Sequence, residues 1–173
     1  MSTLDDALEG TGFSIRRACP CEARELTDFA YASKRSWGYP ENELDDDCGP
    51  LTVTPGYIRE NTVFVAEDDR RILGFFSLIP TDRPDVIELD HFWVNPETRG
   101  RGVGRAMFGR VRDEALRLGM RTLFIVSDPN AEAFYLRAGA IRTGDTPACS
   151  GERRLPTLEL PLQPKETSTP SGE

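Results

Sequence analysis

A short turn rich in arginine and glycine, near the middle of the chain, restricts what the surrounding sequence can fold into. Residues 99–104 read Arg-Gly-Arg-Gly-Val-Gly, between an apolar-rich run at 86–94, typical of a strand, and a segment of helical periodicity at 103–118. Glycine lets a backbone approach a ligand closely and take positive φ, and the N-terminus of a helix favours an anion. The turn therefore predicts a phosphate or pyrophosphate site. Three arginines would add positive charge to it: Arg99, Arg101 and Arg105.

The segments on either side of this turn predict a mixed sheet with helices. We expect strands at 13–17, 62–66, 72–79, 122–126, 140–142 and 155–162. We expect helices after Pro20, from Pro55 and at 131–138, the first of them broken by a loop over 33–40 that contains glycine and proline. The nearly all-apolar run at 122–126 indicates a central strand covered on both faces. Pro156 and Pro161 confine the last strand to an edge or to its ends. The order predicts an α+β fold of the α/β/α type, in one domain over 13–162, between disordered segments at 1–12 and 163–173.

Charge and hydropathy exclude several classes of protein. The net charge is −8, whereas a general nucleic-acid binder is basic. We find no apolar run long enough to span a bilayer and no secretory leader, so we expect a cytoplasmic protein. The chain has four cysteines and one histidine, a poor set for a zinc site. We therefore expect no metal, and we interpret the cysteines at 19, 21, 48 and 149 as free thiols.

The spacing within the turn excludes two familiar phosphate sites. No Gly-Lys-Ser/Thr follows, so it is not a Walker loop, and Arg105 stands where a dinucleotide fingerprint needs glycine or alanine. Together with its flanks, from Trp93 to Met107, the turn instead resembles the acyl-CoA motif of the GNAT superfamily of N-acetyltransferases, Gln/Arg-x-x-Gly-x-Gly/Ala. The stretch at 130–140, Asn-Ala-x-x-Phe-Tyr-x-x-x-Gly-Ala, resembles the second signature of that superfamily, with Gly-Ala in place of its usual Gly-Phe.

This resemblance implies a GNAT-like acyl-CoA N-acyltransferase fold, with splayed central strands at 86–94 and 122–126 and helices on both faces of the sheet. It further implies that the donor is acetyl-CoA. Backbone N–H groups of the turn would hold the pyrophosphate, and main-chain groups near Trp93 and Val94 would pair with the pantetheine arm. The residues expected to bind the cofactor are Trp93, Val94, Arg99, Gly100, Arg101, Gly102, Val103, Gly104, Arg105 and Asn130.

Transfer of an acetyl group to an amine needs a base, an oxyanion donor and an acid. Glu88 is the candidate base, because the family often places a glutamate here. The alternative is that Glu88 simply faces solvent, on the same strand face as Asp90. Asp90 is a weaker candidate for the base. We interpret His91 as packed or hydrogen-bonded; simple alternation points it away from Glu88, and a bulge would reverse that parity. The N–H of Val94 would meet the oxyanion, and Tyr135 matches the family's general acid, with aromatic packing as the alternative.

The acceptor amine is the least determined part of the prediction. Trp37 and Tyr39 are the candidate substrate-binding residues, with cation–π contact as the mechanism and packing on the core as the alternative. The acidic residues of 41–47 are interpreted as a solvated loop. We expect direct transfer in a ternary complex to a primary amine of a small molecule. A protein or peptide α-amine acetyltransferase, a CoA-binding regulatory module without turnover and a homodimer stay open.

Overall fold

The computed structural model describes residues 12–44, 51–69, 71–98, 100–148 and 153–163. The rest lies outside the described residues and includes most of both terminal segments expected to be disordered. The described strands are β1 (Ser14–Arg17), β2 (Thr62–Glu67), β3 (Ile72–Pro80), β4 (Val86–Val94), β5 (Thr122–Val126), β6 (Ile141–Pro147) and β7 (Arg154–Pro161). The described helices are α2 (Ala23–Arg35), α3 (Pro55–Glu60), α4 (Val103–Arg117) and α5 (Glu132–Arg137), with 3-10 turns η1 (Pro20–Glu22), η2 (Glu41–Glu43) and η3 (Pro96–Thr98).

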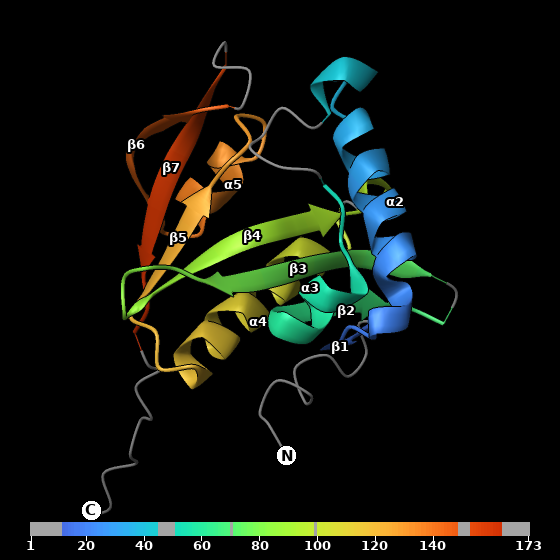
Figure 1. Ribbon diagram of the computed structural model, residues 1–173, viewed down its shortest axis with the longest axis horizontal. Helices are drawn as coiled ribbons and strands as arrows, with labels where there is room; N and C mark the ends of the chain where they lie inside the picture. Colours follow the sequence, from blue (N-terminus) through green and yellow to red (C-terminus); the bar gives the residue numbers. More distant parts are fainter. Residues whose placement is uncertain (1–11, 45–50, 70, 99, 149–152, 164–173) are drawn as a thin grey trace, which may run out of the picture.

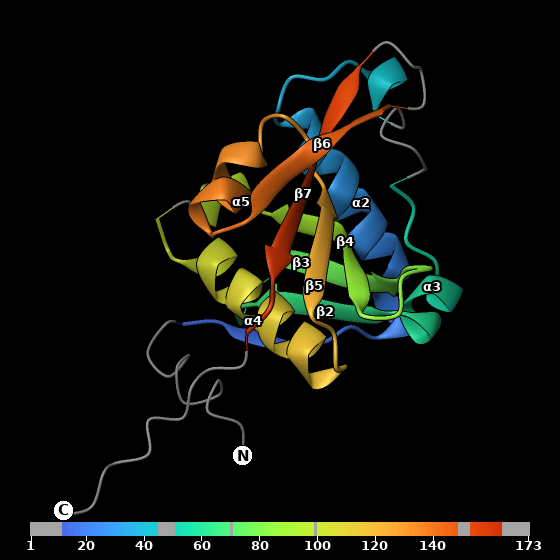
Figure 2. The same cartoon turned by 90° about the vertical axis from the view of Figure 1, so that its left-hand side faces the viewer.

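The seven strands form one mixed sheet in the order β1-β2-β3-β4-β5-β7-β6. Only β4 and β5 pair in parallel among these neighbours, joined through α4, and the other pairs are antiparallel. Helices α4 and α5 cover one face, and α2 and α3 cover the other (Figure 1, Figure 2). The predicted mixed-sheet α+β fold is confirmed. None of the described helices is long and apolar enough to cross a bilayer.

Two cores hold these layers together, one on each face of the sheet. The core under α4 and α5 contains Met107, Val111 and Leu123, and the core under α2 and α3 contains Leu26 and Phe75. Burial of apolar side chains supplies the main stabilisation on both faces. The sheet therefore has its apolar support on both sides around β3 and β4.

A close contact sets the position of α4 on the sheet. A Cβ atom on Gly74 of β3 would lie 2.6 Å from the carbonyl oxygen of Trp93 and 2.7 Å from Sδ of Met107. Glycine therefore lets α4 lie against β3 and β4. The glycine turn, which leads from β4 into α4, is held in place by this packing.

Three expectations about the elements need correction. The stretch from Ser33 was expected to be a loop, but α2 continues to Arg35, because Ser33 and Lys34 are buried against the protein. Strand β5 is central but covered on one face only: Leu123 and Ile125 are buried, whereas Phe124 and Val126 are partly exposed, because α2 and α3 lie over the earlier strands. Strand β7 lies inside the sheet, between β5 and β6, and Pro161 is its last residue, as expected. Pro156, however, is its third residue; it lies beyond the last pair of β7 with β5, Val126↔Thr157, and is paired with Asp145 of β6.

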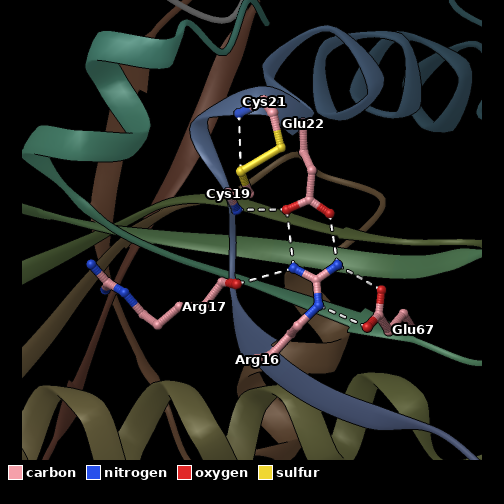
Figure 3. Close-up of a disulfide and its surroundings, with 6 residues drawn as sticks. All are labelled: Arg16, Arg17, Cys19, Cys21, Glu22 and Glu67. Atoms are coloured by element: carbon pink, nitrogen blue, oxygen red, sulfur yellow. Dashed lines mark hydrogen bonds and ion pairs between the residues drawn. A yellow bond between two sulfur atoms is a disulfide. The ribbon is translucent and has the colours of Figure 1, made fainter.

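The cysteines also differ from the expectation of free thiols. Cys19 and Cys21 form a disulfide, with Cα atoms 5.2 Å apart, where η1 turns the chain between β1 and α2 (Figure 3). That separation lies within the range a disulfide spans. Beside it, the guanidinium of Arg16 bridges the carboxylates of Glu22 and Glu67 at 2.7 Å each. The two cysteines at 48 and 149 lie outside the described residues.

Candidate functional site

The central feature of the site is the divergence of β4 and β5. They pair from Val86↔Thr122 to Leu89↔Ile125, after which β4 continues without β5 beside it (Figure 1). This confirms the predicted splay. Beyond Leu89, the backbone polar groups of β4 that point away from β3 thus face an open edge rather than a neighbouring strand.

The register of β3 and β4 shows which groups face that edge. The N–H of Asn95 donates to the carbonyl of Leu73 at 2.8 Å, and Val94 pairs with Gly74. In an antiparallel ladder successive residues point their N–H groups to opposite sides, so the N–H of Val94 points toward the open edge, as does that of Phe92. The main-chain groups of Trp93 point to β3 instead. Sequence reasoning named Trp93 and missed Phe92.

A cleft of about 970 Å³ opens along this edge, and we call it the glycine cleft. Its lining comes from the end of β4, the turn before α4 and helix α5, and includes Val94, Gly100, Gly102, Gly104, Arg105 and Phe134. Gly100 and Gly102 have φ of 86° and 78°, and a Cβ on either would meet nothing within 4 Å. Gly102 caps α4 without a side-chain hydrogen bond, so the first N–H groups of the helix are available to an anion.

The other residues predicted for this cofactor site are placed differently. Val103 lines the cleft, whereas Arg101 does not and forms an ion pair with Asp68 at 3.4 Å. Arg99 lies outside the described residues. Asn130 does not line the cleft either, and its side-chain amide donates to the Tyr39 hydroxyl at 3.2 Å. The structure thus brings together the glycines, Val103 and Arg105, and leaves Arg101 and Asn130 outside.

A second cavity, of about 460 Å³, adjoins the glycine cleft, and we call it the acidic cavity. It is lined by Glu88 and Asp90 of β4, by Asp128 after β5, and by Tyr57 of α3. Five residues line both spaces: Trp37, Phe92, Trp93, Ala131 and Tyr135. The two spaces therefore meet at the splay, with the Tyr135 side chain at their junction.

A β-bulge in β4 places the charged residues of this cavity. Ser77 of β3 pairs with His91, but the next residue, Leu78, pairs with Leu89, so Asp90 is the extra residue. A bulge reverses the alternation of side chains. His91 therefore lies on the same face of the sheet as Glu88, the reversed parity that the sequence left open.

His91 is packed and hydrogen-bonded, as expected. The residue is 7% exposed, and its Nδ1 accepts a hydrogen bond of 3.0 Å from Nε1 of Trp93. The remaining proton of the neutral ring is then on Nε2, which lies 3.7 Å from Oδ2 of Asp90. Burial lowers the pKa of His91 against the opposing effect of the Asp90 charge, so the ring is neutral near pH 7.

A polar network that sequence reasoning missed supports the bulge. The Tyr57 hydroxyl donates to Oδ2 of Asp90 and lies 2.6 Å from Oγ of Ser77, and that Oγ accepts from the N–H of His91 at 3.0 Å. Burial, and then the charge of Asp90, raise the pKa of Tyr57, so that it keeps its proton and can donate. In the sequence, the signal for this network is Ser77, a single hydroxyl in the otherwise apolar strand β3.

Glu88 and Tyr135 have the properties of a proton acceptor and a proton donor. Within the described ranges, no hydrogen bond or ion pair engages the Glu88 carboxylate. Burial raises its pKa, and the charge of Asp90 raises it further. Tyr135 is 5% exposed, and burial, followed by the charge of Asp128, raises its pKa. Glu88 is thereby a stronger base than an exposed glutamate, and Tyr135 remains a phenol at neutral pH.

The two aromatic residues predicted to bind substrate lie in different places: Trp37 lines the site and Tyr39 does not. Trp37 is 38% exposed, lines both spaces, and its ring centroid lies 5.6 Å from that of Trp93. Tyr39 lines neither, and the cations of Lys34 and Arg153 lie 5.6 Å and 4.5 Å from its ring centroid. Its face is therefore occupied by cations of this chain. Asp45, Asp46 and Asp47 lie outside the described residues.

Comparison with known proteins agrees with this architecture. The acetyltransferase (GNAT) family model matches residues 24–140. S-(2-succino)cysteine N-acetyltransferase of Bacillus subtilis (strain 168) is 28% identical over 131 residues, 70% of this chain and 78% of that protein. N-acetyltransferase 8 of Homo sapiens is 24% identical over 127 residues, 69% of this chain and 56% of that protein. The chain thus spans little more than half the length of the human relative.

A solved structure shares the fold. The structure of yncA from Salmonella typhimurium, solved with its cofactor acetyl-CoA, superposes with a TM-score of 0.65 at 20% identity over 88% of this chain and 95% of that one. At this identity the likeness shows the fold. The family match covers more than half of the chain and carries the assignment. The chain belongs to the acetyltransferase (GNAT) family, whose enzymes are acetyl-CoA-dependent N-acetyltransferases.

Proposed function

We propose that this protein transfers an acetyl group from acetyl-CoA to a primary amine of a small molecule, by direct transfer in a ternary complex. The observation that carries this proposal is the meeting of the glycine cleft and the acidic cavity at Tyr135, with Glu88 in the cavity. The Bacillus subtilis relative is named for a small amino compound, which supports an acceptor of that size. Neither Cys19 nor Cys21 lines the two spaces, which argues against an acyl-enzyme formed on either.

The glycine cleft fits the donor on its own residues. Gly100 and Gly102 leave open space where side chains would stand, and the uncapped start of α4 supplies N–H groups for a pyrophosphate. Arg105 would add a positive charge from the cleft wall. Along the open edge of β4, the main-chain groups of Phe92 and Val94 would pair with the amides of the pantetheine arm.

Glu88 in the acidic cavity and Tyr135 at the junction carry out different proton transfers. Glu88 accepts a proton from the acceptor ammonium, which leaves the free amine that can react. When bound, acetyl-CoA supplies the thioester whose carbonyl carbon gains the C–N bond while its C–S bond breaks, giving the N-acetyl product and the CoA thiol. The N–H of Val94 donates to the oxygen that becomes negative. Tyr135 gives its proton to the departing sulfur and regains one from the nitrogen, so that each cycle releases one proton from Glu88.

Two measurements on the purified chain test this proposal. Acetyl-CoA should raise the melting temperature, because a ligand that binds only the folded state stabilises it. CoA thiol should then appear when primary amines are added, detected with a thiol reagent. Binding of acetyl-CoA without thiol release over a wide amine panel would instead favour a regulatory module. Release only with peptides would favour an α-amine acetyltransferase.

A further inference from the structure

The indole ring of Trp93 forms part of the boundary between the acidic cavity and the glycine cleft. Trp93 lines both spaces, and its ring centroid lies 5.6 Å from that of Trp37, which also lines both. An amine in the cavity and a thioester in the cleft would therefore both border this pair of rings. The direction in which the Trp93 ring points thus affects how the two reactants meet.

One hydrogen bond fixes the direction of this ring beyond what packing does. The Nε1–H of Trp93 donates to Nδ1 of His91 at 3.0 Å. An indole nitrogen can only donate, so its partner must present an acceptor atom. Because Nε1 is the single polar atom of the Trp93 side chain, the ring depends on His91 for its polar contact.

The His91 ring is itself fixed by its neighbours. The ring centroids of Tyr57, from α3, and of Phe75, from β3, lie 5.6 Å and 5.5 Å from that of His91. Its Nε2 faces Oδ2 of Asp90 at 3.7 Å, which leaves Nδ1 to Trp93. Packing from two elements and the bulge of β4 therefore hold the ring on which the Trp93 side chain is anchored.

His91 has no direct part in the proton transfers proposed above. It borders the acidic cavity but not the glycine cleft, and Glu88 and Tyr135 already supply a base and an acid. An effect of His91 on turnover is therefore expected to act through Trp93, the side chain that it holds.

We propose that His91 is a positioning residue for acetyl transfer, which holds the Trp93 ring as a fixed wall that orients the amine toward the thioester. The inference rests on the proposed function for the location of the amine, in the acidic cavity with Glu88. Without an acceptor atom at the place of Nδ1, the Trp93 ring could turn, and a reactant misplaced by about 1 Å can lose about 10²-fold in rate. Binding of CoA uses the glycine turn and the open edge of β4, so it should not depend on His91.

Two substitutions of similar shape at position 91 separate this role from packing. Both His91→Asn and His91→Leu give a side chain that branches at Cγ, but only His91→Asn places an acceptor oxygen near the place of Nδ1. With the amine that the parent chain acetylates fastest, kcat/KM should fall about 10²-fold in His91→Leu and about tenfold in His91→Asn. If His91 only fills the core, the order should reverse, because burying an amide costs more than burying an alkyl group. Turnover in His91→Leu that equals or exceeds that in His91→Asn would overturn the inference.

The tryptophans supply a readout that needs no turnover. The chain contains two of them, Trp37 and Trp93, so the near-ultraviolet circular dichroism of indole reports how firmly this pair of rings is held. In the full chain saturated with CoA, the indole bands should weaken in His91→Leu and stay close to the parental spectrum in His91→Asn, with the Kd of CoA unchanged in both. His91→Phe, which keeps a ring and lacks the acceptor atom, replaces His91→Leu if that variant does not fold. Equal spectra in the two variants would overturn the inference.

The partner side chain provides the control. Trp93→Phe removes the hydrogen-bond donor and keeps an aromatic ring. In the Trp93→Phe background, His91→Asn should lose its advantage in kcat/KM over His91→Leu, because the hydrogen bond that distinguishes them is absent. An advantage that persists there would show that His91 acts by another route, against the inference.

Spectra and turnover together separate this inference from the proposed function. If the spectra differ as expected but the parent chain releases no CoA thiol with any amine, the proposed function fails and the hold of His91 on Trp93 stands. If the parent chain acetylates amines but His91→Leu is at least as active as His91→Asn, the positioning role fails and the proposed function stands. Lower activity and weaker indole bands in His91→Leu than in His91→Asn support both.

Discussion

The glycine cleft and the acidic cavity share five lining residues, Tyr135 among them, yet they are built in different ways. The cleft comes largely from one stretch of chain, from Phe92 to Phe108, together with α5. It offers backbone N–H groups and open space next to glycines. The cavity is assembled from α3, the bulge of β4, the segment after β5 and the strands β6 and β7. It offers side-chain carboxylates and aromatic rings.

This difference explains why the glycine cleft can be recognised from the sequence, whereas the acidic cavity can be recognised only in the tertiary structure. A backbone site needs glycines at fixed spacing, so it leaves a motif. A side-chain site needs only that certain groups meet in space, and the chain can bring them from any distance. Substitutions in the two spaces should therefore have separable effects on donor binding and on acceptor chemistry.

The largest expected effect is on the cavity side, at Glu88. Glu88→Gln removes the base while it preserves shape, so kcat should fall by about 10²–10⁴-fold. The Kd of acetyl-CoA should stay at its parental value, because Glu88 does not line the glycine cleft. Steady-state thiol release and calorimetry give the two numbers. If turnover in this variant equals that of the parent chain, another residue is the base, and Asp90 is the first to examine.

Tyr135→Phe tests the junction of the two spaces. The ring would keep its packing against Phe92 and Phe108, while the proton donor is lost, so we expect kcat to fall by about 10²-fold with acetyl-CoA still bound. The measurement is single-turnover acetylation with donor in excess. Full activity would leave Tyr135 with a packing role only.

Gly104→Val tests the cleft side without straining the backbone. Gly104 has no positive φ, and a Cβ there would meet Val94 and Phe134 only at 3.7 Å and 3.9 Å. The larger valine would occupy the cleft, and the Kd of CoA should rise by about tenfold, or 1.4 kcal/mol.

Gly109→Ala is the matched control for that variant, in the same helix but outside the cleft. Its Cβ would meet nothing within 4 Å, so it should raise the free energy of unfolding by about 0.5–1 kcal/mol and keep CoA affinity. Parental CoA affinity in Gly104→Val would argue that the donor lies elsewhere.

The smallest effect concerns the pH dependence of the base. Glu88 reacts only when ionised, so kcat/KM should decline as pH falls through its raised pKa. Asp90→Asn removes the second cause of that raised pKa, the neighbouring negative charge, so the acidic limb of the kcat/KM profile should move to lower pH. An acidic limb that stays at the same pH would show that the charge of Asp90 does not affect the pKa of Glu88. Loss of all turnover would indicate Asp90 as the base.

Most of the fold could be predicted from local patterns. Helix α3 begins at Pro55, with Thr54 accepting from the N–H of Tyr57, and Gly119 takes a φ of 79° after α4, because caps and turns depend on neighbouring residues. The disulfide between Cys19 and Cys21 was missed, because the spacing alone does not reveal a turn that brings the sulfurs together. The one-sided cover of β5 was missed, because it depends on where α2 and α3 dock.

By itself, the sequence determined the order of elements, the glycine turn and the family, because each depends on residues close together along the chain. Only the tertiary structure decided that Asp90 is a bulge residue, that Tyr57 and Ser77 hold it, and that Asp128 shares a cavity with Glu88. It also separated Trp37, at the site, from Tyr39, outside it. These facts depend on strand register and on contacts between distant segments, which are set by packing across the sheet and leave no local pattern.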